Sequence, residues 1–226
     1  MASMMNLVRE ARADREVARV LMNPYGLNPE GERKGADKGD QRGVKFDETA
    51  QVWTAPFIMA GINTKVVRRS HALQGYPYGR DFRYHEATMM GKGVPGWLRA
   101  AAMSVGLGGF VFLASLGPTR RLLERYLLGS TDTAESARVE RYIAMYPEVR
   151  STYEELPDGT VVRTKITGDR DPGYGSTSKM LAESGVCLAK EELSSDGGVL
   201  TPAAAMGDAL LPRLQENAGL TFVVLG

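Results

Sequence analysis

Three polar side chains are expected to point inward from one helix. The residue pattern predicts this helix from Pro56 through about Leu73. At about 100° per residue, Arg69 falls inside its apolar stripe, while Asn63 and Ser70 lie at the edge. The stripe consists of Ile62, Val66 and Leu73. Inward polar groups have two interpretations, a satisfied hydrogen-bond network or the wall of a pocket that binds a polar substrate.

Tyrosines at predicted turns extend this candidate wall. They follow the helix in the run from Gly75 to Gly79, in the strand predicted at 82–90, and in a glycine-rich turn near residue 174. The same residues could equally be structural. The candidate substrate-binding residues are Asn63, Arg69, Ser70, Tyr78, Tyr84 and Tyr174.

The sequence nominates no catalytic nucleophile and no metal centre. Ser70 stands next to His71, but neighbours on a helix point about 100° apart, so adjacency alone makes no catalytic pair. The only other histidine is His85, and Cys187 is the single cysteine, so neither a metal-ligand cluster nor an internal disulfide is expected. The catalytic residues are unknown at this level.

Two glycine-rich stretches fail the tests for a phosphate-binding loop. A dinucleotide site needs glycines between a strand and a helix, but the stretch from Gly106 ends in Val111 and follows an alanine-rich helix. In the stretch from Gly173, Lys179 does not follow a glycine. An anion at that helix start, or a glycine turn that lets the helix pack closely, both remain open. The chain alone is expected to bind no cofactor.

Charge and composition limit the partners and the compartment. The 28 Lys and Arg residues nearly balance 27 Asp and Glu residues, so no overall field favours nucleic acid. Charged residues interrupt the region where a secretory signal would need apolar residues. The sequence therefore predicts a cytoplasmic protein that is not secreted.

One segment is unusually apolar. Residues 100–119 contain no charge and are flanked by basic residues, namely Lys92, Arg99, Arg120 and Arg121. Its length approaches the roughly 20 residues that span a bilayer, but central glycines and symmetric flanks argue against a crossing. A helical hairpin in one leaflet, an interfacial helix, and a buried core or oligomer-interface helix remain open. The apolar helical segment is predicted over 94–128.

The predicted elements give an α+β fold. A charged connector helix at 5–21 and a long loop at 28–51 form residues 1–52, and an α+β domain follows over 53–226. Strands are expected at 82–90, 148–156, 160–167 and 221–225, in a mainly antiparallel or mixed sheet covered by helices. Further helices are expected at 122–128 and 132–145, and after the capping pairs Asp171-Pro172 and Thr201-Pro202.

Separated motifs in the sequence resemble a known family. They lie at 55–70 with 76–84, at 171–175 with 179–183, and at 197–207. In that order they resemble the C-terminal half of saccharopine dehydrogenase-like oxidoreductases, in the branch that includes trans-acting enoyl reductases of lipid biosynthesis. The resemblance extends from about Asn6 to the end of the chain and is weakest over 130–148.

The resemblance implies a protein about twice this length, whose N-terminal Rossmann half binds NAD(P). That half is absent from this sequence, so a nucleotide-binding domain would be a required partner, supplied by missing sequence or by a separate chain. Homo-oligomer contacts are also implied, and catalysis by this chain alone is not expected. Family members on membranes and lipid droplets favour a peripheral location. The alternative function is a non-catalytic lipid- or membrane-associated protein that uses segment 94–128.

Overall fold

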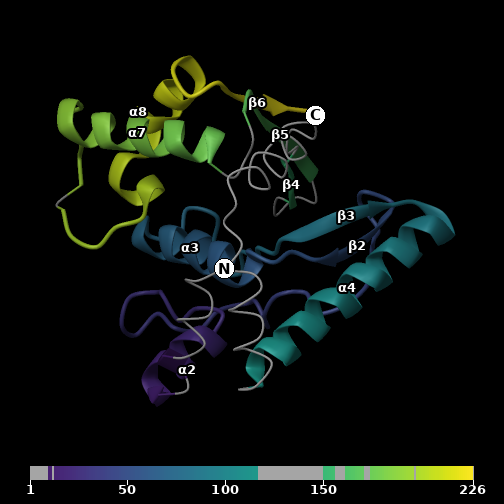
Figure 1. Ribbon diagram of the computed structural model, residues 1–226. Helices are drawn as coiled ribbons and strands as arrows, with labels where there is room; N and C mark the ends of the chain where they lie inside the picture. The colour runs from purple at the N-terminus through teal and green to yellow at the C-terminus, as the bar shows by residue number, and fades with distance from the viewer. Residues whose placement is uncertain are drawn as a thin grey trace, which may run out of the picture. The chain divides into compact units, whose positions relative to one another are not determined.

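Two antiparallel sheets of three strands each organise the described part of the chain (Figure 1). The structure is a computed structural model, which describes residues 10–11, 13–116, 150–155, 161–170, 174–195 and 197–225. The chain divides into two compact units, residues 1–130 and 131–226, each with one of the sheets. Within these ranges, five helices and antiparallel pairing in both sheets confirm an α+β fold.

The first unit begins with the connector helix. Helix α2 spans Arg15–Met22, and the Asp14 side chain accepts a hydrogen bond from the Glu16 amide at its start. It ends at the C-cap Asn23, which is followed by Pro24. The predicted helix is therefore confirmed over this span, whereas residues 1–9 and residue 12 lie outside the described ranges.

The sheet of the first unit was mostly not predicted. Its order is β1-β2-β3, with β1 at Lys45–Asp47, β2 at Val52–Pro56 and β3 at Ala87–Gly91. The prediction of an uninterrupted loop at 28–51 is wrong at β1, and the strand predicted at 82–90 is shorter and later. Helix α3 spans Ala60–Leu73, so Pro56 ends a strand instead of beginning the helix. Proline fits this place because β1 pairs only with residues 52–54, so that β2 has a neighbouring strand on one side at Pro56.

Helix α4 is continuous over Gly93–Ser115 and packs along β2 and β3 (Figure 1). Its 23 residues correspond to roughly 34 Å of helix. Each glycine inside a helix costs about 1 kcal/mol relative to alanine, but the helix persists through Gly106, Gly108 and Gly109. The hairpin interpretation is therefore wrong for the described part of this segment, which ends at residue 116.

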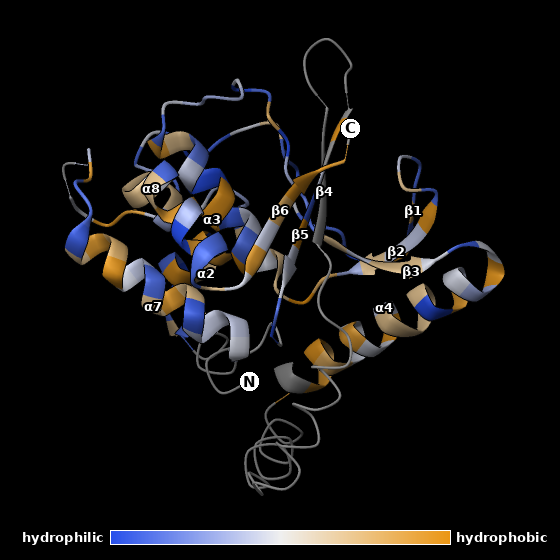
Figure 2. Cartoon of the chain, turned by 90° about the horizontal axis from the view of Figure 1, so that it is seen from above, coloured by the Kyte–Doolittle hydropathy of each residue, from blue (hydrophilic) through white to orange (hydrophobic). Residues whose placement is uncertain are grey.

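Close contact with the sheet explains one glycine of α4. A Cβ at Gly96 would lie 2.2 Å from the Gly91 carbonyl oxygen, so only glycine allows this approach to the end of β3. Ala100 is fully buried on the same side. The opposite side carries exposed apolar residues, and Figure 2 shows hydrophobic colours along most of the helix. The stretch Gly93–Leu113 has the length and composition of a membrane-crossing helix, and 11% of its most apolar window is buried.

The second unit confirms the predicted β-hairpin. Strand β4 at Arg150–Glu155 pairs antiparallel with β5 at Val161–Gly168, while the predicted turn between them lies outside the described residues. Strand β6 at Leu220–Val224 adds to the other edge of β5. The closing strand is thus confirmed, although most of its side chains are half-buried or exposed.

Two helices make the small core of the second unit. Helix α7 at Gly175–Lys190 and helix α8 at Pro202–Glu216 lie side by side around Cys187, Met206 and Leu210 (Figure 1). Helix α8 begins as predicted, because Thr201 accepts a hydrogen bond from the Ala204 amide.

The other predicted cap in this unit is wrong. The N-cap of α7 is Tyr174 and not Asp171, so the helix begins several residues later than the Asp171-Pro172 pair. The helices predicted at 122–128 and 132–145 lie outside the described residues.

Candidate functional site

The buried face of α3 is polar. Its buried residues are Ala60, Thr64, Lys65, Arg68 and His71, whereas Ile62 is 47% exposed. The predicted inward stripe is therefore wrong, and Arg68 takes the buried place expected for Arg69. The segments opposite this face bring carbonyls and carboxylates, which compensate buried polar groups. Lys65 donates to the Gly61 carbonyl at 2.8 Å, and burial lowers its pKa.

Arg68 holds three separate segments together. The guanidinium is 2% exposed and donates to Asp37 Oδ2 at 2.7 Å, to the Pro24 carbonyl at 3.1 Å and to the Tyr84 carbonyl at 2.8 Å. It also donates to Thr64 Oγ1 at 3.0 Å on its own helix. A buried charge needs this degree of compensation. Of the two interpretations of inward polar groups, the satisfied network describes Arg68.

A second ionic group lies between the loop after α2 and the turn after α3. Tyr76 donates its hydroxyl proton to Glu32 at 2.6 Å, and Arg80 donates to the same oxygen at 3.1 Å. The Arg80 guanidinium lies 4.2 Å from the centre of the Tyr76 ring. The Tyr76 hydrogen bond, followed by Arg80, holds the pKa of Glu32 below its usual 4.5. Burial and then Glu32 raise the pKa of Tyr76.

His71 faces a small cavity. Its Nε2 lies 2.8 Å from the Gly79 carbonyl, which only accepts, so Nε2 carries the proton and Nδ1 is an acceptor when the ring is neutral. Nδ1 and Asn28 Oδ1 are buried without a partner in the described residues, and both side chains line the cavity. The cavity offers about 40 Å³ to the centres of water-sized molecules. That space suits one or a few small hydrogen-bond donors and is too small for a substrate.

An aromatic row leads from His71 towards Tyr84. His71 stacks on Tyr78 with ring centres 5.5 Å apart, Tyr78 contacts Phe82 at 5.3 Å, and Phe82 stacks on Tyr84 at 6.4 Å. Tyr78 is more than half exposed, so one end of the row meets solvent. The row is a local apolar surface of the kind that contacts chains and rings of ligands.

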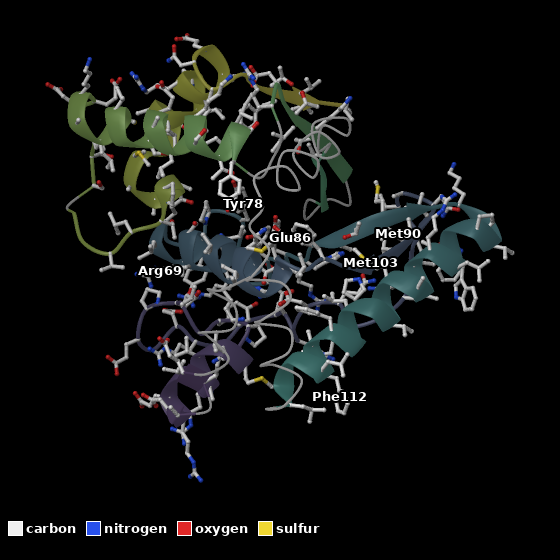
Figure 3. The ribbon with its side chains drawn as sticks, in the orientation of Figure 1. Arg69, Tyr78, Glu86, Met90, Met103 and Phe112 are labelled. Carbon is white, nitrogen blue, oxygen red and sulfur yellow. The ribbon has the colours of Figure 1, made fainter. Side chains whose placement is uncertain are left out.

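The far end of this row is a carboxylate with two hydrogen-bond donors. Tyr84 donates its hydroxyl proton to Glu86 Oε1 at 3.1 Å, and Asn63 Nδ2 donates to Glu86 Oε2 at 2.9 Å. Glu86 is half-buried and lies near the beginning of α3, with Arg69 towards the other end of that helix (Figure 3). We call Asn63, Tyr84 and Glu86 the carboxylate site. Two of the six predicted residues therefore meet on a glutamate that the sequence did not single out.

Arg69, Ser70 and Tyr78 do not join the carboxylate site among the described residues, and Tyr174 belongs to the second unit. Arg69 donates to the Leu27 carbonyl, and Ser70 donates to the Val66 carbonyl one turn earlier at 2.9 Å. Tyr78 belongs to the aromatic row, and Tyr174 caps α7 in the second unit. Arg69 thus connects α3 to the segment after α2, and Ser70 contacts its own helix, which are contacts of a structural kind.

The start of α7 contacts the end of β5 and the residue that follows it. Lys179 forms an ion pair with Asp169 at 2.7 Å, and its hydrogen bond lowers the pKa of that carboxylate. A Cβ at Gly168 would lie 2.9 Å from Ser176 Oγ, so glycine there permits close packing of helix and strand. Gly173 lies outside the described residues, so the anion site and the close-packed glycine turn both stay predictions for this helix start.

An open hollow beside the first sheet was not anticipated. It offers about 250 Å³ to the centres of water-sized molecules, and its wall includes Gln41, Thr54 and His85. Gln41 donates to the Thr54 carbonyl at 3.1 Å, which fixes the preceding loop to β2. Within the described ranges, no group of three or more His, Cys, Asp or Glu side chains could hold a metal ion.

Proteins from mycobacteria share much of this sequence. One from Mycobacterium tuberculosis is named "Putative trans-acting enoyl reductase Rv2449c". It is 40% identical over an alignment of 233 residues, gaps included, and the alignment covers 94% of this chain and 52% of that protein. A "Trans-acting enoyl reductase" of Mycobacterium bovis is 36% identical over 231 residues, with 95% and 53% covered. A protein of the same name from Mycobacterium ulcerans is 34% identical over 223 residues, with 93% and 52% covered.

The chain is similar to trans-acting enoyl reductases. It spans about half the length of the curated relatives it matches. These relatives support the enoyl reductase branch that the motifs indicated. No protein-family model matches the chain. No solved structure matches it either.

Loss of Asp37 is expected to destabilise the first unit strongly. In Asp37→Ala, the buried Arg68 guanidinium loses its shortest charged partner, and breaking such a pair costs about 3–5 kcal/mol. The free energy of unfolding is measured in urea by circular dichroism. The control Asp208→Ala, at an exposed position of α8, changes it by less than about 0.5 kcal/mol. Equal losses in both variants would contradict the conclusion that Arg68 holds the three segments together.

The contribution of Glu32 is expected to depend on pH. Because its pKa is lower in the folded protein, its stabilising effect is present at neutral pH and is lost as the pH falls through that lowered pKa. Wild type should therefore melt at a higher temperature than Glu32→Gln near pH 7, and the difference should shrink as the pH falls below 4.5. Glu192→Gln, also at an exposed position, should show no such convergence. A difference that persists in acid would contradict the ionic explanation.

Proposed function

We propose that this chain is the substrate-side portion of an NAD(P)-dependent oxidoreductase of saccharopine dehydrogenase-like type that acts in lipid metabolism. The observation that carries the proposal is the similarity of almost the whole chain to about half the length of trans-acting enoyl reductases. In this proposal, a nucleotide-binding domain outside these 226 residues completes the enzyme.

The glycine-rich stretch from Gly106 does not form a dinucleotide-binding turn. The glycines from Gly106 lie inside the continuous helix α4, so their backbone groups serve the helix and form no turn before a helix start. Lys179 is engaged by Asp169. A redox cofactor carries the difficult chemistry in such enzymes, and the remaining tasks are to bind and orient the substrate and to exclude water. Those tasks are the ones assigned to this chain.

The carboxylate site and the aromatic row supply suitable groups for these tasks. Glu86 keeps further acceptor capacity on both oxygens, since a carboxylate has about four lone-pair positions and two are occupied. Asn63 and Tyr84 fix its orientation. Tyr78 and Phe82 provide an apolar wall beside it. A substrate with a hydrogen-bond donor next to an apolar chain, such as an amide-bearing acyl carrier, fits this combination.

Dinucleotide binding should require sequence that this chain does not contain. Titration of NADPH or NADH against the chain alone, followed by nucleotide fluorescence, should show no saturable binding. The chain mixed or fused with the portion of the mycobacterial relative outside the match should bind the nucleotide. Tight binding by the chain alone would contradict the division of labour between the two parts.

Replacement of Glu86 should weaken substrate binding in the completed enzyme. Glu86→Gln keeps the shape but loses the charge, so the KM for an enoyl thioester should rise about tenfold with a smaller change in kcat. The matched control is Glu216→Gln at an exposed position of α8, which should leave both constants unchanged. An unchanged KM in Glu86→Gln would remove the carboxylate site from the proposal without affecting the nucleotide result.

A further inference from the structure

Two buried hydrogen-bond acceptors line one small cavity in the first unit. Asn28 is 3% exposed and His71 is 7% exposed, and both side chains belong to the wall of the cavity of about 40 Å³. Asn28 Oδ1 and His71 Nδ1 are buried, and neither has a hydrogen-bond partner among the described residues. Buried polar atoms in folded proteins nearly always have a partner, so this pair of acceptors points to a bound hydrogen-bond donor.

The amide of Asn28 has one possible orientation. Its Nδ2 donates to the Glu32 carbonyl at 3.1 Å, and a flip of the amide would place oxygen against oxygen there. The amide oxygen is therefore the atom that remains to bind a donor in the cavity.

The ring of His71 is fixed in the same sense. Its Nε2 lies 2.8 Å from the Gly79 carbonyl, which only accepts, so Nε2 carries the proton of the neutral ring. Tyr78 stacks on this ring at 5.5 Å between ring centres, and Tyr76 meets it edge-on at 5.1 Å, which hinders a rotation that would exchange the two nitrogens. Nδ1 and the amide oxygen are thus both acceptors, and two acceptors cannot bond to each other.

The charges around the cavity select a neutral ligand. Its lining includes Lys34, Arg68 and Arg80 and contains no carboxylate. A cation would be repelled by these three residues. An anion would face the lone pairs of both acceptors, so an uncharged donor fits the described groups best.

Size and a third polar group favour water as this donor. A water molecule needs roughly 10–15 Å³ for its centre, which the cavity provides, and it usually makes about three hydrogen bonds. Two of these bonds can go to the two acceptors. Tyr25 also lines the cavity, and its hydroxyl accepts from the Asp37 amide at 2.9 Å, so its own proton is left for a bond that a water oxygen can accept.

We propose that the cavity is a water-binding site, in which one ordered water donates to Asn28 Oδ1 and to His71 Nδ1. This water joins the loop after α2 to the last turn of α3, in addition to the contacts of Arg68. Because His71 stacks on Tyr78, the same water supports one end of the aromatic row. The inference does not depend on the proposed function, since it uses only the cavity and the groups that line it.

The water is detected by nuclear magnetic resonance on the full chain with isotope-labelled histidine. The ring proton Hε1 of His71 is next to Nδ1, so it should show a cross-peak to the water resonance with the sign of a long-lived bound molecule. The nitrogen shift of Nδ1 should be that of an unprotonated acceptor at neutral pH. The exposed ring of His85, the other histidine, is the internal control and should show no long-lived water.

Three results of this measurement would overturn the proposal. They are the absence of the water cross-peak at His71, a protonated Nδ1 at neutral pH, and a cross-peak to the side chain of Lys34 in place of water.

The bridge itself is tested by a double-mutant cycle in urea, followed by circular dichroism. Asn28→Ala and His71→Phe should each raise the unfolding constant about tenfold. The double variant should raise it by clearly less than the product of the two, because the bridging water is lost only once. His71→Phe combined with Lys92→Ala, at an exposed position of the same unit, is the control and should give the simple product. A simple product for the Asn28 and His71 pair would overturn the bridge. So would an effect larger than the product, which two facing acceptors without a donor would give.

Discussion

The buried guanidinium of Arg68 is the interaction on which the first unit depends. An unpaired charge in the interior costs several kcal/mol, so the fold must bring oxygen atoms to every side of this group. Asp37 and the carbonyls of Pro24 and Tyr84 meet this demand from three segments that are distant in sequence. The path of the glycine-rich loop at 28–43 is therefore set by hydrogen-bond compensation, and apolar contact has a smaller part.

The position of the carboxylate site depends on the same contacts of Arg68 and Asp37. The Tyr84 carbonyl accepts from Arg68, and its amide donates to Asp37 at 3.2 Å, so the backbone at this residue is fixed from both sides. Its hydroxyl then reaches Glu86, while Asn63 reaches the same carboxylate from the first turn of α3. Tyr84 therefore belongs to both groups of contacts. Its backbone takes part in the Arg68 network, and its side chain takes part in the carboxylate site.

Local signals in the sequence were sufficient for some elements and misleading for others. Thr201-Pro202 begins α8 as predicted, and the hairpin and the final strand were predicted correctly, because capping and turn chemistry act over a few residues. Pro56 misled because proline suits both a helix start and a strand end, and only the pairing with Ala87 decides between them. Arg68 was missed because its partners are 31 and 44 residues away.

In the first unit, several polar side chains are buried and several large apolar side chains are exposed. Among the described residues, its buried apolar side chains are Tyr25, Ala55, Ala60 and Ala100, of which three are alanines. Several larger aliphatic side chains of α4 are exposed, among them Val94, Leu98 and Val105. Hydrogen bonds of a buried arginine are specific in direction but contribute little net stability, because they mainly offset the cost of burying the charge. The apolar surface that could contribute more lies outside, where its stabilising effect becomes available only when another surface covers α4.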